Sequence, residues 1–441
     1  MFAWRTVAAA GLLLAAATAG RAQTVTLAEP VKAGDCFRVQ IEMRLAGEMR
    51  IQKESQLKTI KLEARASHDY PERVLALGAG NAVEKAARVY ETAKAVIGVG
   101  GDRTERALRP ERRLLVAQRW KDQLLVYSPA GALYRDELEL TSQHFDSLAL
   151  TGVLPGKPVA VGDTWKVPSA VVQALCLFEG LTEQAVTGKL ESVKDGVAAF
   201  ALTGTASGID GGALVKTTVE ATGRFDLNAK RLVALDWKQK DERGQGPVSP
   251  AAVVETTTTV RRRLIEQPEG LSDVALVSVP DKEPPAPLLN LDYRDPKGRF
   301  SLLHGREWQT VAQTDEHVVM RLMDRGDFVA QLTVTPWTAA EKGKHMAPED
   351  FKKAMNETPG WTAETELQAS EVPAEGGRWV YRYSVQGQMD SGPVLQNFYL
   401  VAGPGGEQVV LAFTLTPKQV EKLGARDLSV VTSLEVPAVK K

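Results

Sequence analysis

The fold of the first half of the chain follows from one stretch, Val215-Lys-Thr-Thr-Val-Glu-Ala-Thr-Gly-Arg-Phe-Asp-Leu-Asn-Ala-Lys-Arg-Leu-Val-Ala-Leu-Asp-Trp-Lys-Gln239. A polar turn at residues 228–230 separates two segments of strand-like composition, and this pattern is typical of a β-hairpin. We therefore predict that residues 215–225 and 231–239 form adjacent long strands of a large antiparallel sheet.

Other segments of the first half extend this sheet. Residues 37–43 and 60–64 alternate apolar with polar side chains, which predicts strands with one buried and one solvated face. Further strands are predicted at residues 114–118, 123–127, 188–193 and 197–202. The first half is therefore expected to be a large antiparallel β-rich module.

Two helices are expected within this module. In residues 81–97, apolar side chains recur near helical spacing, with Asn81 placed as N-cap and Glu84 at the third helical position. A second helix is predicted near residues 168–178. We expect both helices to interrupt the series of strands.

A proline-rich segment divides the chain. Residues 280–287 read Pro-Asp-Lys-Glu-Pro-Pro-Ala-Pro, and proline fixes φ and removes backbone donors. Such a segment favours an extended, semi-rigid spacer. We predict a β-rich module over residues 23–265, a linker over residues 266–290 and a second module over residues 291–437.

The second module combines strands with two helices. One helix is predicted over residues 348–355, because Pro348 suits its first position and acidic residues follow in the first turn. Another is predicted to begin at Thr416, with Gln419 completing a capping box. Strands are predicted at residues 300–303, 317–323, 328–335, 378–386, 394–401 and 408–415. The predicted fold class of the whole chain is α+β, with the second module an antiparallel sheet flanked by helices.

Two resemblances add to this interpretation. The stretch Tyr293-Arg-Asp-Pro-Lys-Gly-Arg-Phe-Ser-Leu302 followed by Trp308 resembles the start of the Mog1/PsbP/DcrB family of α/β/α sandwiches, although Gly305-Arg-Glu stands where a proline is usual. That family includes photosystem subunits and transport-related factors, so the resemblance implies a fold and carries over no catalytic residue.

Two short stretches of the first module resemble other classes of protein. Leu154-Pro-Gly-Lys-Pro-Val-Ala-Val-Gly-Asp-Thr-Trp165 resembles a motif of bacterial extracytoplasmic β-rich domains of unknown function. Gly223-Arg-Phe-Asp-Leu227 is similar to hairpins of lipoprotein-carrier half-barrels. The second similarity implies that a carrier function has to be considered.

The amino-terminal residues predict export. Trp4-Arg5 precedes an apolar run over residues 7–17, and Gly20 and Ala22 suit the positions before a cleavage site. The run is shorter than the roughly 18–20 residues that cross a bilayer. We predict that residues 1–22 are a signal peptide and that the mature protein is periplasmic or secreted, with no transmembrane span.

The charge balance bears on the class of partner, and the cysteine content bears on a disulfide. The chain has 54 basic and 55 acidic side chains, so we expect no nucleic-acid partner, which would call for a basic excess. In an oxidising compartment the two cysteines, Cys36 and Cys176, are candidates for one disulfide. The alternative is that Cys176, within the apolar residues 171–178, is a small buried hydrophobe.

No catalytic, cofactor or metal site is predicted. The five histidines lack metal-ligand spacing, and the nearest approach to a chemical group, His144-Phe-Asp146, is interpreted as a surface pair. We find no Gly-x-Ser-x-Gly, phosphate-binding loop or His-Glu-x-x-His motif. Trp337 and Trp361 are the first candidates for partner-binding aromatics, with core packing as the alternative.

Three functions remain open. The leading hypothesis is an exported, non-enzymatic binding or scaffold protein of the cell envelope that binds an envelope protein or an apolar ligand. The alternative is a lipid or lipoprotein carrier with an apolar cavity in the first module, and the third is an exported hydrolase. A carrier requires an open apolar cavity, whereas a scaffold should have a filled core.

Overall fold

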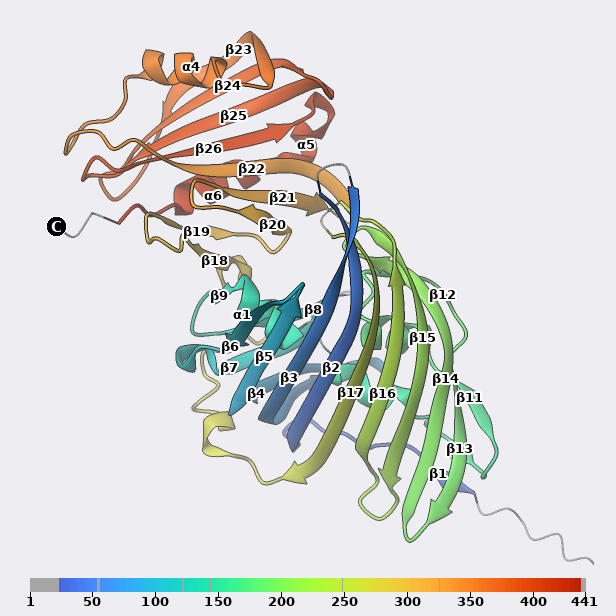
Figure 1. Cartoon of the computed structure of the whole chain (residues 1–441). Helices are drawn as coiled ribbons and strands as arrows, with labels where there is room; N and C mark the ends of the chain where they lie inside the picture. The colour runs from blue at the N-terminus through green and yellow to red at the C-terminus, as the bar shows by residue number, and fades with distance from the viewer. Residues whose placement is uncertain are drawn as a thin grey trace, which may run out of the picture.

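The structure is a computed structural model that describes residues 24–53, 56–120, 123–142, 145–247, 249–324 and 326–437. The predicted signal peptide, residues 1–22, lies outside the described residues. Figure 1 shows a large curved sheet formed by the first half of the chain and a smaller sheet formed by the last third.

Among the described residues, the first module builds a fourteen-stranded sheet in which every pairing is antiparallel. Its main path runs β11-β13-β14-β15-β16-β17-β2-β3-β4-β7-β8. The strands are β2 (Cys36–Lys53), β3 (Gln56–Leu77), β4 (Val83–Val89), β5 (Thr92–Val99), β6 (Asp102–Ala107), β7 (Leu114–Trp120), β8 (Gln123–Tyr127), β11 (Thr164–Lys166), β12 (Gly180–Gln184), β13 (Thr187–Lys194), β14 (Val197–Asp210), β15 (Ala213–Asp226), β16 (Arg231–Arg243) and β17 (Ala251–Ile265).

The hairpin predicted for residues 215–225 and 231–239 is confirmed. Strands β15 and β16 pair antiparallel, and Asp226 and Arg231 are the last partners before the turn. The Asp226 carboxylate accepts hydrogen bonds from the backbone amides of Asn228 and Ala229 at 2.9 Å, which fixes the polar turn.

The helix predicted over residues 81–97 is wrong. The structure has a 3₁₀ turn, η1 (Ala79–Asn81), followed by strands β4 and β5. In β4 the residues from Lys85 to Arg88 are all buried, because other segments cover both faces of this strand. Period-two alternation is therefore lost, and a short apolar run without alternation does not distinguish a strand from a helix.

Short helices pack against the inward face of the curved sheet, the face that carries Phe37, Val39 and Ile41. They are α1 (Arg135–Ser142), η3 (Ser147–Val153) and α2 (Ser169–Leu175). The last of these confirms the helix predicted near residues 168–178. The two-stranded sheet of β1 (Val25–Thr26) and β10 (Pro158–Val159) belongs to the same buried cluster.

The second module is a seven-stranded antiparallel sheet with a helical layer on each face, as predicted (Figure 1). Helix α4 (Pro348–Asn356) covers one face, and α5 (Val420–Leu423) with α6 (Arg426–Ser433) covers the other. The strand order is β20 (Trp308–Gln313), β21 (Val318–Asp324), β22 (Asp327–Trp337), β26 (Gln408–Leu415), β25 (Gly392–Ala402), β24 (Trp379–Met389) and β23 (Trp361–Val372).

Most of the predicted elements of the second module are confirmed, including the capping box of Thr416 and Gln419 before α5. The sequence did not predict the two edge strands, β20 and β23. The exposed pattern of β23, in which most side chains face solvent, gives no apolar alternation to recognise.

Residues 266–290 are not a free spacer. They contain the short elements η4 (Glu269–Leu271) and α3 (Ala286–Leu289), and Leu271 is buried against Ala87 of the first module. Arg73 Nη1 donates a hydrogen bond to the Leu271 carbonyl at 2.8 Å, and Gln118 Nε2 donates to the Lys282 carbonyl at 3.0 Å. The segment is therefore held along the first module.

The two modules also share a sheet. Strand β18 (Leu291–Arg294) pairs antiparallel with β19 (Ser301–His304) and parallel with β9 (Leu133–Tyr134) of the first module. Backbone pairing across the junction brings the start of α1 next to the loop between β19 and β20.

Candidate ligand-binding cavity

A large cavity lies between the inward face of the curved sheet and the helical layer of the first module. Its volume is about 2610 Å³. Pockets for small molecules usually measure about 300–1,000 Å³, so this cavity is larger than a compact ligand requires.

The wall on the sheet side follows from period-two alternation. Side chains two residues apart point to the same face of a strand, so each long strand contributes a row of inward residues. The apolar lining residues from the sheet are Met43, Leu45, Leu62, Ala64, Ala95, Ile97, Val215, Trp237, Ala252 and Val254. The helical layer adds Leu138, Phe145, Leu148, Val171, Ala174, Leu175 and Phe178. Apolar side chains therefore form the larger part of the wall, and polar and charged side chains form the rest.

The lining extends along the strands, from Glu29 and Leu227 at one end to Asp210 and Gly326 at the other, and the helical layer interrupts it in part. Further along β3, Tyr70 is buried, and its hydroxyl lies 3.4 Å from the hydroxyl of Ser147 in η3. Toward the opposite end of β3, Leu62 and Ala64 line the cavity instead. The second module lies at this end and contributes Arg306, Glu307, Gln309, Met323, Asp324 and Gly326 to the lining.

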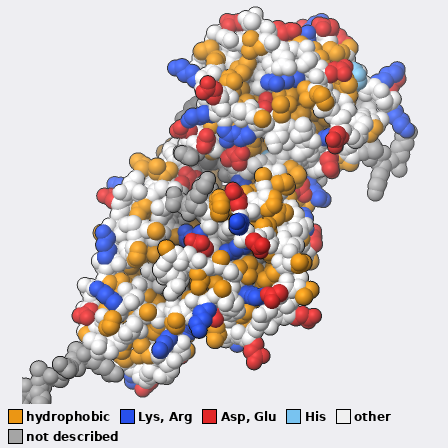
Figure 2. All heavy atoms as spheres, turned by 180° about the vertical axis from the view of Figure 1, so that it is seen from behind, with side chains coloured by type: hydrophobic (Ala, Val, Ile, Leu, Met, Phe, Trp, Pro, Cys, Tyr) orange, Lys and Arg blue, Asp and Glu red, His pale blue; other side chains and the backbone are white. Residues whose placement is uncertain are grey.

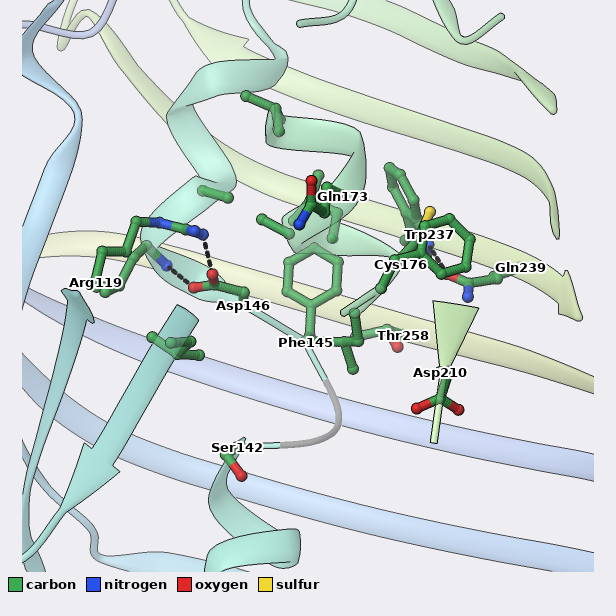
Figure 3. Close-up of a pocket in the computed structure, with 18 of the residues that line it drawn as sticks. Arg119, Ser142, Phe145, Asp146, Gln173, Cys176, Asp210, Trp237, Gln239 and Thr258 are labelled. Atoms are coloured by element: carbon green, nitrogen blue, oxygen red, sulfur yellow. Dashed lines mark hydrogen bonds and ion pairs between the residues drawn. The ribbon is translucent and has the colours of Figure 1, made fainter. Parts of the chain in front are cut away.

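A row of hydrogen-bonded polar groups runs along strand β16, and Figure 3 shows its first contact, between Trp237 and Gln239. Trp237 Nε1 donates to Gln239 Oε1 at 3.0 Å, and Gln239 Nε2 donates to both oxygens of the Asp241 carboxylate, at 2.9 and 3.0 Å. Thr217 Oγ1 donates to the same carboxylate at 2.6 Å. Burial raises the pKa of Asp241, with a contribution from the charge of Asp210. These polar groups are paired with one another within the wall.

A buried ion pair stands on the other side of Phe145. Arg119 Nη2 forms an ion pair with Asp146, whose carboxylate also accepts a hydrogen bond from the Leu148 amide at 3.0 Å and so caps η3 (Figure 3). Burial raises the pKa of Asp146, against the opposing effects of Arg119 and Arg88. Asp146 was expected to pair with His144 at the surface, but it is buried and bound to arginine; His144 lies outside the described residues.

The two cysteines are buried free thiols, so the candidate disulfide is not formed in this structure. Cys36 opens β2, whereas Cys176 follows α2 and lines the cavity. Burial raises the pKa of both thiols. Cys176 therefore occupies the position of a small buried hydrophobe, which was the alternative interpretation.

The tryptophans proposed for partner binding lie in the second module, away from the large cavity. Trp361 is buried beside α4 and donates through Nε1 to the Met355 carbonyl at 3.0 Å. Trp337 is half-buried at the end of β22 and lines a small depression of about 400 Å³ with Arg299 and Asp315. Trp361 is thus a core residue, and Trp337 keeps part of its ring accessible.

In the described part of the chain, no group of three or more histidine, cysteine, aspartate or glutamate side chains is arranged to hold a metal ion. None of its helices has the length and apolar character needed to cross a membrane. On the face seen in Figure 2, basic, acidic and hydrophobic side chains are interspersed over both modules.

No family model matches this chain, and no curated protein matches it. Among solved structures, the chain is similar to cyanobacterial PsbP from Synechocystis sp. PCC 6803, at 17% identity over 34% of this chain and 92% of that one, with a TM-score of 0.27. It is also similar to the Ran-binding protein Mog1p of Saccharomyces cerevisiae, at 14% identity over 33% of this chain and 95% of that one, with a TM-score of 0.27.

A longer match involves lipovitellin, at 6% identity over 54% of this chain and 26% of that one, with a TM-score of 0.30. The matched part is therefore about a quarter of the lipovitellin chain. Representatives of the PsbP and Mog1 class that the second module was expected to resemble are thus found among similar structures, each covering about a third of this chain. Nothing in these comparisons supports the expected resemblance of the first module to extracytoplasmic domains of unknown function.

Proposed function

We propose that this chain is an exported, non-enzymatic binding protein that holds a lipid-class molecule in the cavity of its first module. From the sequence alone, the carrier was the alternative to a binding or scaffold protein. We now place the carrier hypothesis first. The observation that carries it is a volume of about 2610 Å³ bounded by the inward apolar residues of the long strands. Transfer of apolar surface from water into such a space is favourable by about 25 cal/mol per Å².

The position of the cavity supports binding in preference to a scaffold role. A scaffold module is expected to fill its core and to present an apolar patch outside. Here the inward rows of β2, β3 and β17 continue beyond the helical layer and face open volume at Leu45, Leu62 and Val254. Apolar side chains that face a large interior space are suited to hydrocarbon chains.

For the second module we propose a PsbP-like α/β/α sandwich. The residues behind this resemblance form part of its core: Trp308 and Phe300 are buried, and the rings of Tyr293 and Phe300 stack at 5.9 Å. The module also lines the end of the cavity through Arg306 and Met323. Its proposed role is to close that end of the binding site.

Native mass spectrometry tests the proposed function. The mature protein is purified from its own cell envelope and sprayed intact, and any bound molecule is then released by denaturation and weighed. We expect a lipid mass in stoichiometric amount. Recovery of only the bare protein, together with failure to take up lipid from detergent or vesicles, would refute the carrier function and leave the envelope scaffold.

A further inference from the structure

Resting on the proposed lipid binding, we infer that Arg135 and Arg306 hold the anionic headgroup of an amphipathic ligand, at the end of the cavity where the two modules meet. The ligand class is then a hydrocarbon chain or chains joined to a carboxylate or a phosphate. Both arginines line the cavity.

The two arginines are fixed by backbone carbonyl groups from both modules. Arg135, the first residue of α1, donates through Nη2 to the carbonyls of Arg306 and Trp308 at 2.7 and 2.6 Å. Arg306 donates through Nε to the Leu289 carbonyl at 2.8 Å and through Nη2 to the Val126 carbonyl at 2.6 Å. These contacts hold both guanidinium groups in place and leave part of their donor capacity unused, since each guanidinium has five N–H groups.

Neither arginine forms an ion pair with a carboxylate of the described residues, and Arg135 Nε is buried without an acceptor. The acidic groups nearby are engaged elsewhere: Arg106 pairs with Asp136 at 2.9 Å and with Glu139 at 2.7 Å. Glu307 is the exception, because its carboxylate lines the cavity and its charge acts on both arginines.

The carboxylates nearby offset the burial of the two guanidinium groups only in part. Burial lowers the pKa of Arg135, against the opposing charges of Glu139, Glu307 and Asp136. Burial, together with the charge of Arg135, lowers the pKa of Arg306 to about 10, against the opposing charge of Glu307. Two cations that oppose each other in a partly desolvated space are stabilised by an anion, and guanidinium groups match carboxylate and phosphate oxygens in geometry.

The other charged groups of the cavity do not need a ligand. Arg243 pairs with Asp210 at 3.2 Å, and Arg119 pairs with Asp146. Asp241 already accepts hydrogen bonds from Thr217 and Gln239. The pair at the module junction differs from these three groups, because a ligand's charge would give it the ion pair that they already have or do not need.

Isothermal titration with oleate and with oleyl alcohol tests this inference, because the two ligands share a chain and differ in headgroup charge. We expect the wild-type protein to bind oleate at least about tenfold more tightly than oleyl alcohol, as one charge-assisted contact provides. Arg306→Gln and Arg135→Gln should each remove this preference and leave the affinity for oleyl alcohol unchanged. Arg103→Gln, at an exposed arginine of β6, is the matched control and should keep the preference.

The outcomes separate the inference from the proposed function. Equal affinity of the wild-type protein for both ligands would overturn the headgroup site and leave lipid binding intact, whereas binding of neither would overturn lipid binding itself. The alcohol affinity and the melting temperature of each variant report whether its cavity is still folded. If both glutamine variants fold poorly, the ratio of the two affinities in the wild-type protein and its decrease with added salt still decide the question. A parallel titration with dioleoyl phosphatidate and dioleoylglycerol distinguishes a phospholipid from a fatty acid as the source of the anion.

Discussion

Glu72 and Arg88 lie opposite each other on strands β3 and β4, where Arg88 Nε donates to the Glu72 carboxylate at 2.8 Å. Their side chains are only 5% and 3% exposed. Arg88 Nη2 also donates to Ser147, the first residue of η3, at 2.8 Å. This buried ion pair therefore connects the sheet to the helical layer that forms one side of the cavity.

Removing one partner of this pair should destabilise the protein strongly. Glu72→Ala leaves the Arg88 charge buried without its counterion, and we expect the free energy of unfolding to fall by about 3–5 kcal/mol. Urea denaturation followed by circular dichroism measures this change. Glu48→Ala, at an exposed position of β2, is the control and should stay within about 0.5 kcal/mol. Similar losses in the two variants would contradict the structural role of the pair.

Narrowing the cavity should reduce ligand loading without unfolding the protein. Ala64 of β3 lines the cavity, so the indole of Ala64→Trp would project into the open volume. The next residue, Arg65, is exposed on the opposite face, and Arg65→Trp is the matched control. We expect the lipid-to-protein ratio after loading to drop in Ala64→Trp alone, because the indole covers about 150–250 Å² of apolar surface that a hydrocarbon chain would otherwise contact. Unchanged loading would place the ligand elsewhere.

His304 should make the stability depend on pH. This side chain is buried beside the module junction, and burial lowers its pKa from 6.5 to about 4. Below pH 6.5 the unfolded chain gains a proton, whereas the folded protein stays neutral until about pH 4. The free energy of unfolding should therefore fall between pH 6.5 and 4, by roughly 3 kcal/mol in total. Denaturant titrations across this pH range measure the free energy of unfolding. We expect this free energy to depend less on pH in His304→Gln than in the wild-type protein, and an equal dependence in both would show that His304 titrates normally.

In the second module, the buried carboxylate of Asp427 is stabilised by two side chains of β25. Tyr399 donates to it at 2.8 Å and Asn397 Nδ2 at 3.0 Å. Tyr399→Phe should lower the free energy of unfolding by about 1.5–3 kcal/mol, because the lost hydrogen bond serves a charged group. Tyr383→Phe removes a hydroxyl that donates to the neutral amide oxygen of Asn356 at 3.0 Å, and should cost only about 1 kcal/mol. Thermal or urea unfolding measures the loss of stability in each variant. A larger loss in Tyr383→Phe than in Tyr399→Phe would contradict the proposed role of the Tyr399 hydrogen bond.

Several features of the fold were predictable because their signals are local. The hairpin of β15 and β16 follows from strand-like segments around a polar turn, and the start of α5 follows from the Thr416 and Gln419 capping box. Residues 81–97 were mispredicted as helix because β4 is covered on both faces, by η3 and by the segment containing Leu271. The segment containing Leu271 lies far from β4 in the chain, so no local sequence pattern could predict that it covers this strand.

The sequence by itself determined many of the antiparallel strands and the flanking helices of the second module, because alternation and capping residues act on their own neighbours. It could not determine the cavity, since inward apolar rows look the same whether a helix covers them or open space does. Nor could it bring Arg135 to Arg306, which are 171 residues apart in the chain. The pairing of β9 with β18 helps to place them together, and the proposed headgroup site depends on this tertiary arrangement, in which no carboxylate of the described residues forms an ion pair with either arginine.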